Sequence, residues 1–157
     1  MRIVLAALVM LVLCRPTYAQ TFNIEEDASY KPLSSTIKQA IQSSGNNSWD
    51  KDALQGCDLV GAPIDLTLKG KTNGYIASTN GCGGGSAAFP VWLVSYINDI
   101  PRVVLSYGAV TIKIDHRRTN GLRDVIATQS NTGHCETIKL KFDGKRYAEV
   151  GRKKCNP

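Results

Sequence analysis

The chain has 157 residues, a formal net charge of +6 and five cysteines. Its length is that of one domain, and beyond the first residues no apolar run is long enough to cross a bilayer as a helix. Length and composition therefore exclude a membrane-spanning mature protein and a chain of several domains.

The first residues have the organisation of a secretory signal peptide. Twelve apolar residues run from Ile3 to Cys14, and small residues suited to cleavage follow at Thr17 and Ala19. We predict a signal peptide over residues 1–19 and a mature domain over residues 20–157, periplasmic or secreted after cleavage near Ala19. An alternative is a lipid-anchored precursor in which Cys14 is acylated.

The predicted mature domain keeps four cysteines, and an even number in an oxidising compartment indicates two disulfides. Three pairings are open from sequence. We expect Cys57 with Cys82 and Cys135 with Cys155, because each pair closes a short loop. No two of these cysteines form a C-x-x-C pair, which argues against a cysteine zinc site, and we expect neither a metal nor a cofactor.

One amphipathic helix is predicted near the start of the mature domain. Between residues 32 and 44, apolar residues recur at helical spacing, and Gly45 ends the pattern. The apolar positions of this helix are Leu33, Ile37, Ala40 and Ile41.

After Cys57 the chain breaks into short runs rich in β-branched and aromatic residues, separated by Gly, Asn, Asp and Pro. This pattern predicts a mainly β fold: an antiparallel sheet or a small sandwich or barrel, with one N-terminal helix. An α+β arrangement is the alternative. The predicted strands cover residues 64–70, 74–79, 90–97, 102–109, 111–115, 124–128, 136–142 and 145–150.

Turn-forming residues separate several of these strands. Asp143-Gly144 fits a two-residue hairpin turn, and the strand before it alternates apolar residues with lysines, which predicts one packed and one cationic face. A second Asn-Gly turn is expected to be supported by a nearby aspartate that hydrogen-bonds its backbone amides. The residues assigned to turns are Asn98, Asp99, Asn120, Gly121, Asp124, Asp143 and Gly144.

The stretch NGCGGGSAAFPVWLV, residues 80–94, places four glycines around Cys82. A phosphate-cradling loop needs a helix after its glycines, whereas strand-forming residues follow here, so no nucleotide partner is expected. We predict a turn tethered by a disulfide at Cys82, whose glycines permit unusual backbone angles. Gly83, Gly84 and Gly85 are candidates for the rim of a binding site.

The stretch DHRRTNGLRDVIA, residues 115–127, superficially matches a calcium loop. His116 and Arg118 stand where oxygen ligands are needed, so no calcium site is expected. The order of the Cys/Gly-rich turn, PRVVLS, TNGLRDVIA and FDGKRY resembles a group of uncharacterised secreted bacterial proteins. Its N-G-x-x-D-[IV] segment resembles a single degenerate FG-GAP or VCBS repeat. The resemblance spans residues 80–150 and implies strand-and-loop units, without an assigned activity.

The excess of positive charge lies at the C-terminal end of the chain. Residues 20–134 carry ten basic and ten acidic side chains, whereas residues 135–157 carry seven basic and three acidic ones. Such a cationic hairpin suits an acidic protein, an anionic polymer or lipid headgroups, although basic residues also simply decorate solvent faces. The candidate binding residues are Lys139, Lys141, Arg146, Arg152, Lys153 and Lys154.

These observations favour a noncatalytic binding module of the periplasm or exterior. Its expected partner is an unknown envelope or extracellular protein, which it recognises, for example, as an inhibitor or immunity factor. Nucleic acid is disfavoured as a partner.

Two alternatives remain open from sequence. A small ribonuclease-like hydrolase would use His116 and His134 as acid and base, with Lys139 or Lys141 on the phosphate. A cell-wall glycan binder would need exposed aromatic rings for stacking. The candidates are Trp92, Tyr96 and Tyr107, whose alternative role is packing in the core.

Overall fold

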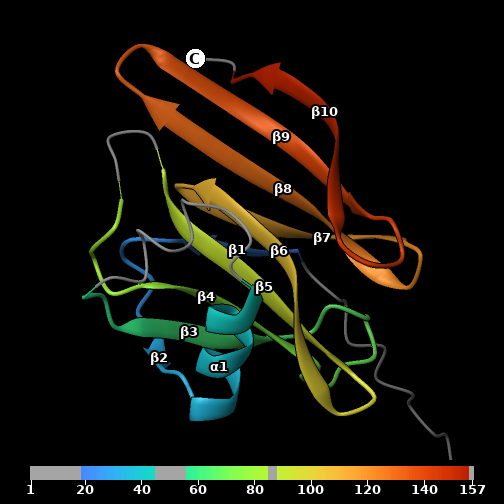
Figure 1. Cartoon of the computed structure of the whole chain (residues 1–157). Helices are drawn as coiled ribbons and strands as arrows, with labels where there is room; N and C mark the ends of the chain where they lie inside the picture. The colour runs from blue at the N-terminus through green and yellow to red at the C-terminus, as the bar shows by residue number, and fades with distance from the viewer. Residues whose placement is uncertain (1–18, 45–55, 85–87, 156–157) are drawn as a thin grey trace, which may run out of the picture.

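The computed structural model describes residues 19–44, 56–84 and 88–155, and Figure 1 shows the course of the chain. The predicted signal segment, Gly45 and Gly85 therefore lie outside the described residues, apart from Ala19. The elements in chain order are β1 (Gln20–Asn23), β2 (Lys31–Pro32), α1 (Ser35–Ser44), β3 (Leu59–Ile64), β4 (Gly74–Thr79), β5 (Phe89–Ile97), β6 (Ile100–Ala109), β7 (Thr111–Thr119), β8 (Leu122–Asn131), β9 (His134–Phe142) and β10 (Tyr147–Lys154).

The described strands form two antiparallel sheets of five strands each. Sheet A has the order β1-β7-β8-β9-β10, and sheet B has the order β2-β3-β4-β5-β6. The chain passes from sheet B to sheet A at the sharp bend between β6 and β7. The prediction of a mainly β fold with one helix is confirmed, and the two sheets pack face to face as a sandwich.

The core between the sheets follows the alternation of the strands. On β9, Ile138 and Leu140 point into this core, so Lys139 and Lys141 lie on the outer face of sheet A, as the alternation predicted. Packing of the two inner faces excludes water almost completely. The core residues that are at most 1% exposed include Ile76, Val91, Leu93, Ile112, Ile114, Val125, Ala127, Ile138 and Leu140.

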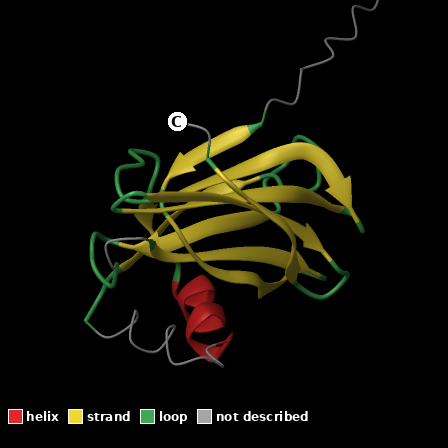
Figure 2. Ribbon diagram, turned by 90° about the horizontal axis from the view of Figure 1, so that it is seen from above, coloured by secondary structure: helices red, strands yellow, loops and turns green. Residues whose placement is uncertain are grey.

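Helix α1 covers the outer face of sheet B, as Figure 2 shows. Ile37 and Ile41 pack there against Trp92, whose side chain is fully buried. The helix begins at Ser35 and not at residue 32, because residues 31–32 pair with β3 as strand β2. No described element covers the outer face of sheet A in the same way, so that face is open to solvent.

The prediction of a strand over residues 64–70 is wrong. Strand β3 ends at Ile64, and the carboxylate of Asp65 then accepts hydrogen bonds from the backbone N–H groups of Thr67 at 2.8 Å and Gly70 at 2.7 Å. Leu68 has a positive φ of 61°, which a strand does not allow. The aspartate thus folds the chain into a turn. Partial burial raises the pKa of Asp65, but these bonds outweigh it and hold the pKa below its usual value.

Two of the predicted turns close hairpins with two residues each. Asn98 and Asp99 both have positive φ between β5 and β6, and Asn120 and Gly121 do so between β7 and β8. Positive φ at both central positions is typical of the type I′ turn, whose backbone twist matches the twist of the two flanking strands.

The third predicted turn is longer than expected. Phe142 pairs with Tyr147, so the loop between β9 and β10 has four residues, 143–146, and not the two residues Asp143 and Gly144. The Asp143 carboxylate accepts hydrogen bonds from the backbone N–H groups of Lys145 at 2.7 Å and Arg146 at 2.8 Å. These bonds satisfy the loop amides and lower the pKa of Asp143.

Both disulfides have the expected pairing. Cys57 is bonded to Cys82 and Cys135 to Cys155, with Cα–Cα distances of 5.9 Å and 5.2 Å. The second bond ties β9 to the end of β10, which is the edge strand of sheet A. It therefore fixes the position of the basic C-terminal strand.

Removing the Cys135–Cys155 bond should destabilise the protein. The bond closes a loop of 20 residues, so replacing both cysteines with serine should lower the free energy of unfolding by about 3 kcal/mol. Urea denaturation followed by circular dichroism measures this change. The Cys57→Ser/Cys82→Ser variant, whose loop of 25 residues is of similar size, should lose a similar amount. An unchanged urea midpoint in the first variant would contradict the prediction.

Candidate functional site

The outer face of sheet A is built from side chains that the strand register aligns in rows. One row crosses β7, β8, β9 and β10 and consists of Lys113, Ile126, Lys139 and Gly151. The next row, two residues along each strand, consists of Thr111, Thr128, Thr137 and Lys153. We call the two rows, with the adjoining Arg117 and Lys141, the cationic face.

The cations of this face lie at regular intervals. Lys113 and Lys139 are two strands apart, which puts their backbones about 10 Å from each other. Lys139 and Lys141 are alternate residues of one strand, about 7 Å apart. Lys153 lies diagonally across from Lys139 on the neighbouring strand, within about 8 Å. The arrangement presents several separated positive charges to one partner surface.

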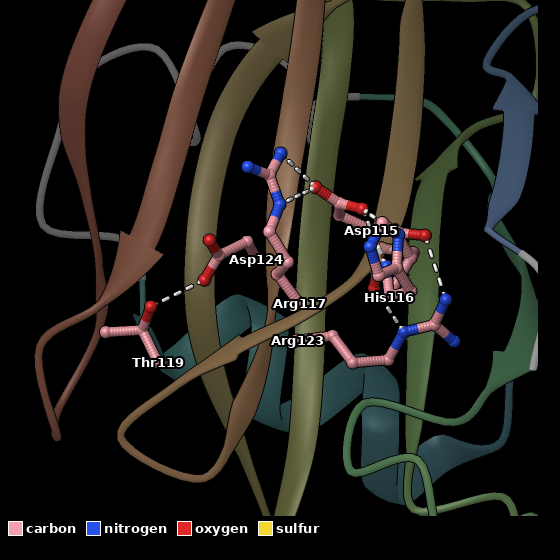
Figure 3. A network of polar contacts seen from close by, with 7 residues as sticks. Asp115, His116, Arg117, Thr119, Arg123 and Asp124 are labelled. Carbon is pink, nitrogen blue, oxygen red and sulfur yellow. Dashed lines mark hydrogen bonds and ion pairs between the residues drawn. The ribbon is translucent and has the colours of Figure 1, made fainter.

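Arg117 is held in place by a buried aspartate, as Figure 3 shows. Its Nε and Nη2 atoms donate to Oδ2 of Asp115 at 2.9 Å and 2.6 Å. The Asp115 side chain is 5% exposed, whereas that of Arg117 is 55% exposed. Burial raises the pKa of Asp115, but hydrogen bonds from Arg117 and His116 outweigh it and leave the pKa below its usual value. The aspartate therefore orients the arginine and is itself shielded from solvent.

Arg123 stabilises the end of sheet A next to this pair. It is 2% exposed, and its guanidinium donates to the backbone carbonyls of Asp115 at 2.6 Å, Ile114 at 2.9 Å and Asp65 at 3.1 Å. Burial lowers the pKa of Arg123, while the carboxylates of Asp65 and Asp115 oppose that effect. The side chain thus ties the loop after β3 to the irregular part of β7. Sequence reasoning missed this role, because nothing local distinguishes Arg123 from an exposed arginine.

A depression of about 330 Å³ opens in the cationic face. Its floor includes the apolar side chain of Ile126 and the backbone at Gly151, which stand on either side of Lys139 in the first row, and polar or charged side chains stand around it. Residues from four strands thus contribute to one hollow. The other residues around the floor are Arg117, Thr137, Lys139, Lys153 and Arg152, whose side chain leaves the opposite side of β10.

The predicted basic residues do not all belong to the cationic face. Arg152 lies on the opposite side of β10, where it donates to Glu149 at 2.9 Å and to Glu136 at 2.7 Å, so its charge is compensated within the chain. Arg146 lines a separate groove of about 410 Å³ between β6 and β10. Lys154 is exposed at the end of β10, opposite Glu136. Of the predicted set, Lys139, Lys141 and Lys153 share the cationic face.

Sequence reasoning missed two cations of this face, Lys113 and Arg117. A signal for Lys113 was present, since Thr111 and Lys113 alternate with the buried residues Ile112 and Ile114. No such alternation indicated Arg117, because a β-bulge separates Ile114 from Arg118 in the pairing of β7 with β8. The bulge decides on which side Arg117 emerges.

The glycine-rich turn belongs to sheet B and not to the cationic face. Gly81 and Gly83 have positive φ values of 69° and 74°, as the predicted turn requires. A Cβ atom at Gly84 would lie 2.3 Å from the ring of Phe89. Backbone conformation and close packing thus account for these described glycines, and the predicted ligand role of Gly83 and Gly84 stays a prediction.

The Asn120-Gly121 turn has a different support from the one predicted. The Asp124 carboxylate accepts a hydrogen bond from the hydroxyl of Thr119 at 2.7 Å, where backbone amides of the loop were expected as donors. The Asn120 side chain donates to the carbonyl of Phe142 at 2.9 Å. The side chains of the turn thereby hold β7, β8 and β9 together.

The three aromatic candidates do not form one platform. Trp92 is fully buried beneath α1, and Tyr107 packs partly buried against the core between the sheets. Tyr96 is 37% exposed and meets Tyr75 edge to face, with 6.4 Å between ring centroids. A stacking site that uses all three predicted rings is therefore not available.

The two histidines lie at opposite ends of sheet A. His116 is near the irregular part of β7, while His134 pairs with Asn131 at the β8–β9 hairpin. The intervening length of β8 separates them by roughly 20 Å. They cannot act as acid and base on one scissile bond, because both groups must reach it at hydrogen-bonding distance. Over residues 19–44, 56–84 and 88–155, no group of three or more metal-ligating side chains gathers.

Comparison with known proteins finds no matching family model, no similar curated protein and no similar solved structure. The resemblance of residues 120–125 to an FG-GAP or VCBS repeat stays a prediction; in the structure this segment forms the turn and the start of β8. None of the helical structure in the described part of the chain has the length and apolar character that a membrane span requires.

Proposed function

We propose that this chain is a noncatalytic binding module that recognises an acidic surface of another protein through the cationic face of sheet A. The single observation that supports the proposal is the gathering of five cations on that face. They come from three different strands, and the fold turns all of them to the same side. The five are Lys113, Arg117, Lys139, Lys141 and Lys153.

The carboxylates nearest to the cationic face are Asp115, which compensates the charge of Arg117, and Asp124, so the exposed charge of the face is chiefly that of its four lysines. Asp115 and Asp124 are 3% and 2% exposed and are hydrogen-bonded within the chain. Buried and paired carboxylates leave the exposed ammonium groups to dominate the field that an approaching molecule meets. An acidic partner is thereby attracted and oriented before contact.

The breadth of the face favours a protein partner. Five adjacent strands span about 20 Å, and a protein interface buries roughly 800 Å² on each partner. The proposed location of the encounter is the periplasm or the exterior. Two disulfides are compatible with an oxidising compartment, and the apolar N-terminal segment has the pattern of an export signal. An inhibitor or immunity factor of another exported protein would fit this setting.

The test compares two charge-reversal variants with the same change of net charge. Lys139→Glu/Lys153→Glu alters the cationic face, whereas Lys31→Glu/Lys38→Glu alters β2 and α1, which belong to the sheet B side. Each disulfide-intact protein is immobilised and exposed to envelope extract of the source organism, and captured proteins are identified and then titrated individually.

A specific partner should lose affinity by about tenfold or more with the first variant and keep it with the second, since reversed charges at the contact repel an acidic surface. Added salt should weaken wild-type binding. Equal capture by the wild type and both variants would reject the cationic face as the contact.

A further inference from the structure

The depression in the cationic face exists because β10 lacks a side chain at Gly151. The pairing of β9 with β10 shifts between Glu149 and Gly151, which makes Val150 the extra residue of a β-bulge. After the shift, Gly151 stands opposite Lys139 on the outer face. A Cβ atom at Gly151 would meet no other atom within 4 Å, so the position is open space.

Backbone conformation does not explain a glycine at this position. Gly151 is absent from the glycines with positive φ, so its backbone suits other residues. Glycine weakens a strand, by roughly 0.5–1 kcal/mol relative to alanine. A glycine inside a strand often marks a place where another group approaches the backbone closely. The open floor at Gly151 has the properties of such a place.

We propose that this depression holds the carboxylate side chain of an acidic residue presented by the partner protein; the inference rests on the proposed function. The methylene stem of a glutamate packs on the backbone at Gly151 and on the methylene stem of Lys139, beyond which Ile126 extends the apolar surface. Its carboxylate meets the charges of Lys139 and Lys153 at the rim, with Arg117 beside them.

The apolar floor favours a carboxylate side chain over phosphate or sulfate. A phosphate or sulfate group presents oxygen on all sides and gains nothing from contact with Ile126. A glutamate combines an apolar stem with a charged end, which matches a floor of apolar atoms below a cationic rim. Charge complementarity and shape therefore select the same ligand chemistry.

Arg117 reaches this site in a fixed orientation. Two of its three guanidinium nitrogens are bound to Asp115, so the side chain loses little freedom when a ligand arrives. Arg117 acts here as a positioned hydrogen-bond donor at one side of the hollow, because Asp115 compensates its charge, whereas the lysines adjust to the incoming group. The volume of about 330 Å³ accommodates one side chain and is at the small end for a ligand pocket.

The test fills the depression and leaves every charge in place. Gly151→Leu places a side chain in the depression beside Lys139, and Gly151→Thr is a smaller second variant of the same kind. Both should fold, because the added Cβ meets open space and the chain loses a flexible glycine. Urea denaturation should show equal or greater stability than that of the wild type.

The probe is an acetylated, amidated peptide of six glutamates, titrated into wild type and variants and followed by NMR chemical shifts. Gly151→Leu should weaken its binding by about tenfold, as expected when one anchoring contact is lost. Lys139→Glu/Lys153→Glu should remove binding. Inorganic polyphosphate and a sulfated disaccharide are titrated in parallel and should bind more weakly than the peptide.

The outcomes separate the two proposals. Binding that survives both glycine variants but not the lysine variant would overturn the carboxylate pocket and leave the cationic face as the contact. Binding that survives all variants would reject both. Tight binding of polyphosphate or of the sulfated disaccharide, without binding of the glutamate peptide, would overturn the acidic polypeptide as the ligand and indicate an anionic polymer.

Discussion

Replacing Arg123 with methionine should lower the free energy of unfolding by about 3–5 kcal/mol. The guanidinium donates to three backbone carbonyls, from Asp65, Ile114 and Asp115, in a site that water does not reach. Methionine fills similar volume but donates nothing, so the carbonyls lose these hydrogen bonds while they stay buried, and each such loss is costly. The hydroxyl of Tyr147 also donates to the carbonyl of Arg123 at 2.6 Å, which couples the site to β10.

Arg118→Met is the matched control for this prediction. Arg118 is exposed and donates to the carbonyl of Thr67 at 3.1 Å, so its loss should cost about 1 kcal/mol or less. Urea denaturation of both variants, followed by circular dichroism, measures the difference. A cost below about 1 kcal/mol for Arg123→Met would show that the carbonyls find other partners.

Replacing Trp92 with alanine should cost about 3–5 kcal/mol, an effect of the same size. Trp92 has no exposed surface and lies among residues of α1 and of the outer face of sheet B, including Ile37, Ile41 and Val94. Truncation leaves a cavity between helix and sheet, and the surrounding residues collapse into it only in part. Because α1 has ten residues and depends on this packing, it should also lose protection from hydrogen exchange.

Tyr96→Ala is the control from the same strand. Tyr96 lies on the same face of β5 as Trp92 but beyond the part that α1 covers, and it is 37% exposed. Its replacement should cost about 1 kcal/mol or less, chiefly through the edge-to-face contact with Tyr75. Equal losses for the two variants would contradict the assignment of Trp92 to the core.

Much of the β structure could be predicted because its strands alternate clearly and are bounded by turn residues. Strand β4 has the predicted bounds, and the predicted strands from residue 90 onward all lie wholly or largely within β5 to β10. The three strands that precede β4, namely β1, β2 and β3, were missed. Strand β3 contains Gly61 and Pro63, which weaken a strand signal. The structure explains Gly61, since a Cβ there would lie 2.2 Å from the carbonyl oxygen of Ile76.

The candidate site could be predicted only in part, because its membership depends on a bulge. Arg152, Lys153 and Lys154 are three consecutive basic residues, and nothing in the sequence shows which of them belong to the cationic face. Simple alternation from Tyr147, which points into the core, would send Arg152 to the outer face and Lys153 inward. The extra residue at Val150 reverses this order, so Lys153 joins the cationic face and Arg152 meets Glu136 and Glu149.

The sequence by itself determined the strand-rich character, the positions of the hairpin turns and the basic nature of the C-terminal region. These properties are local: they depend on side-chain alternation, on residues that tolerate positive φ and on the count of charges. The tertiary structure decided which cations share a surface. Lys113 and Arg117 are more than twenty residues from Lys139 in the chain and reach the same face only because β8 lies between β7 and β9. Register and bulges set that arrangement, and both arise from pairing between distant segments and from burial of the opposite face.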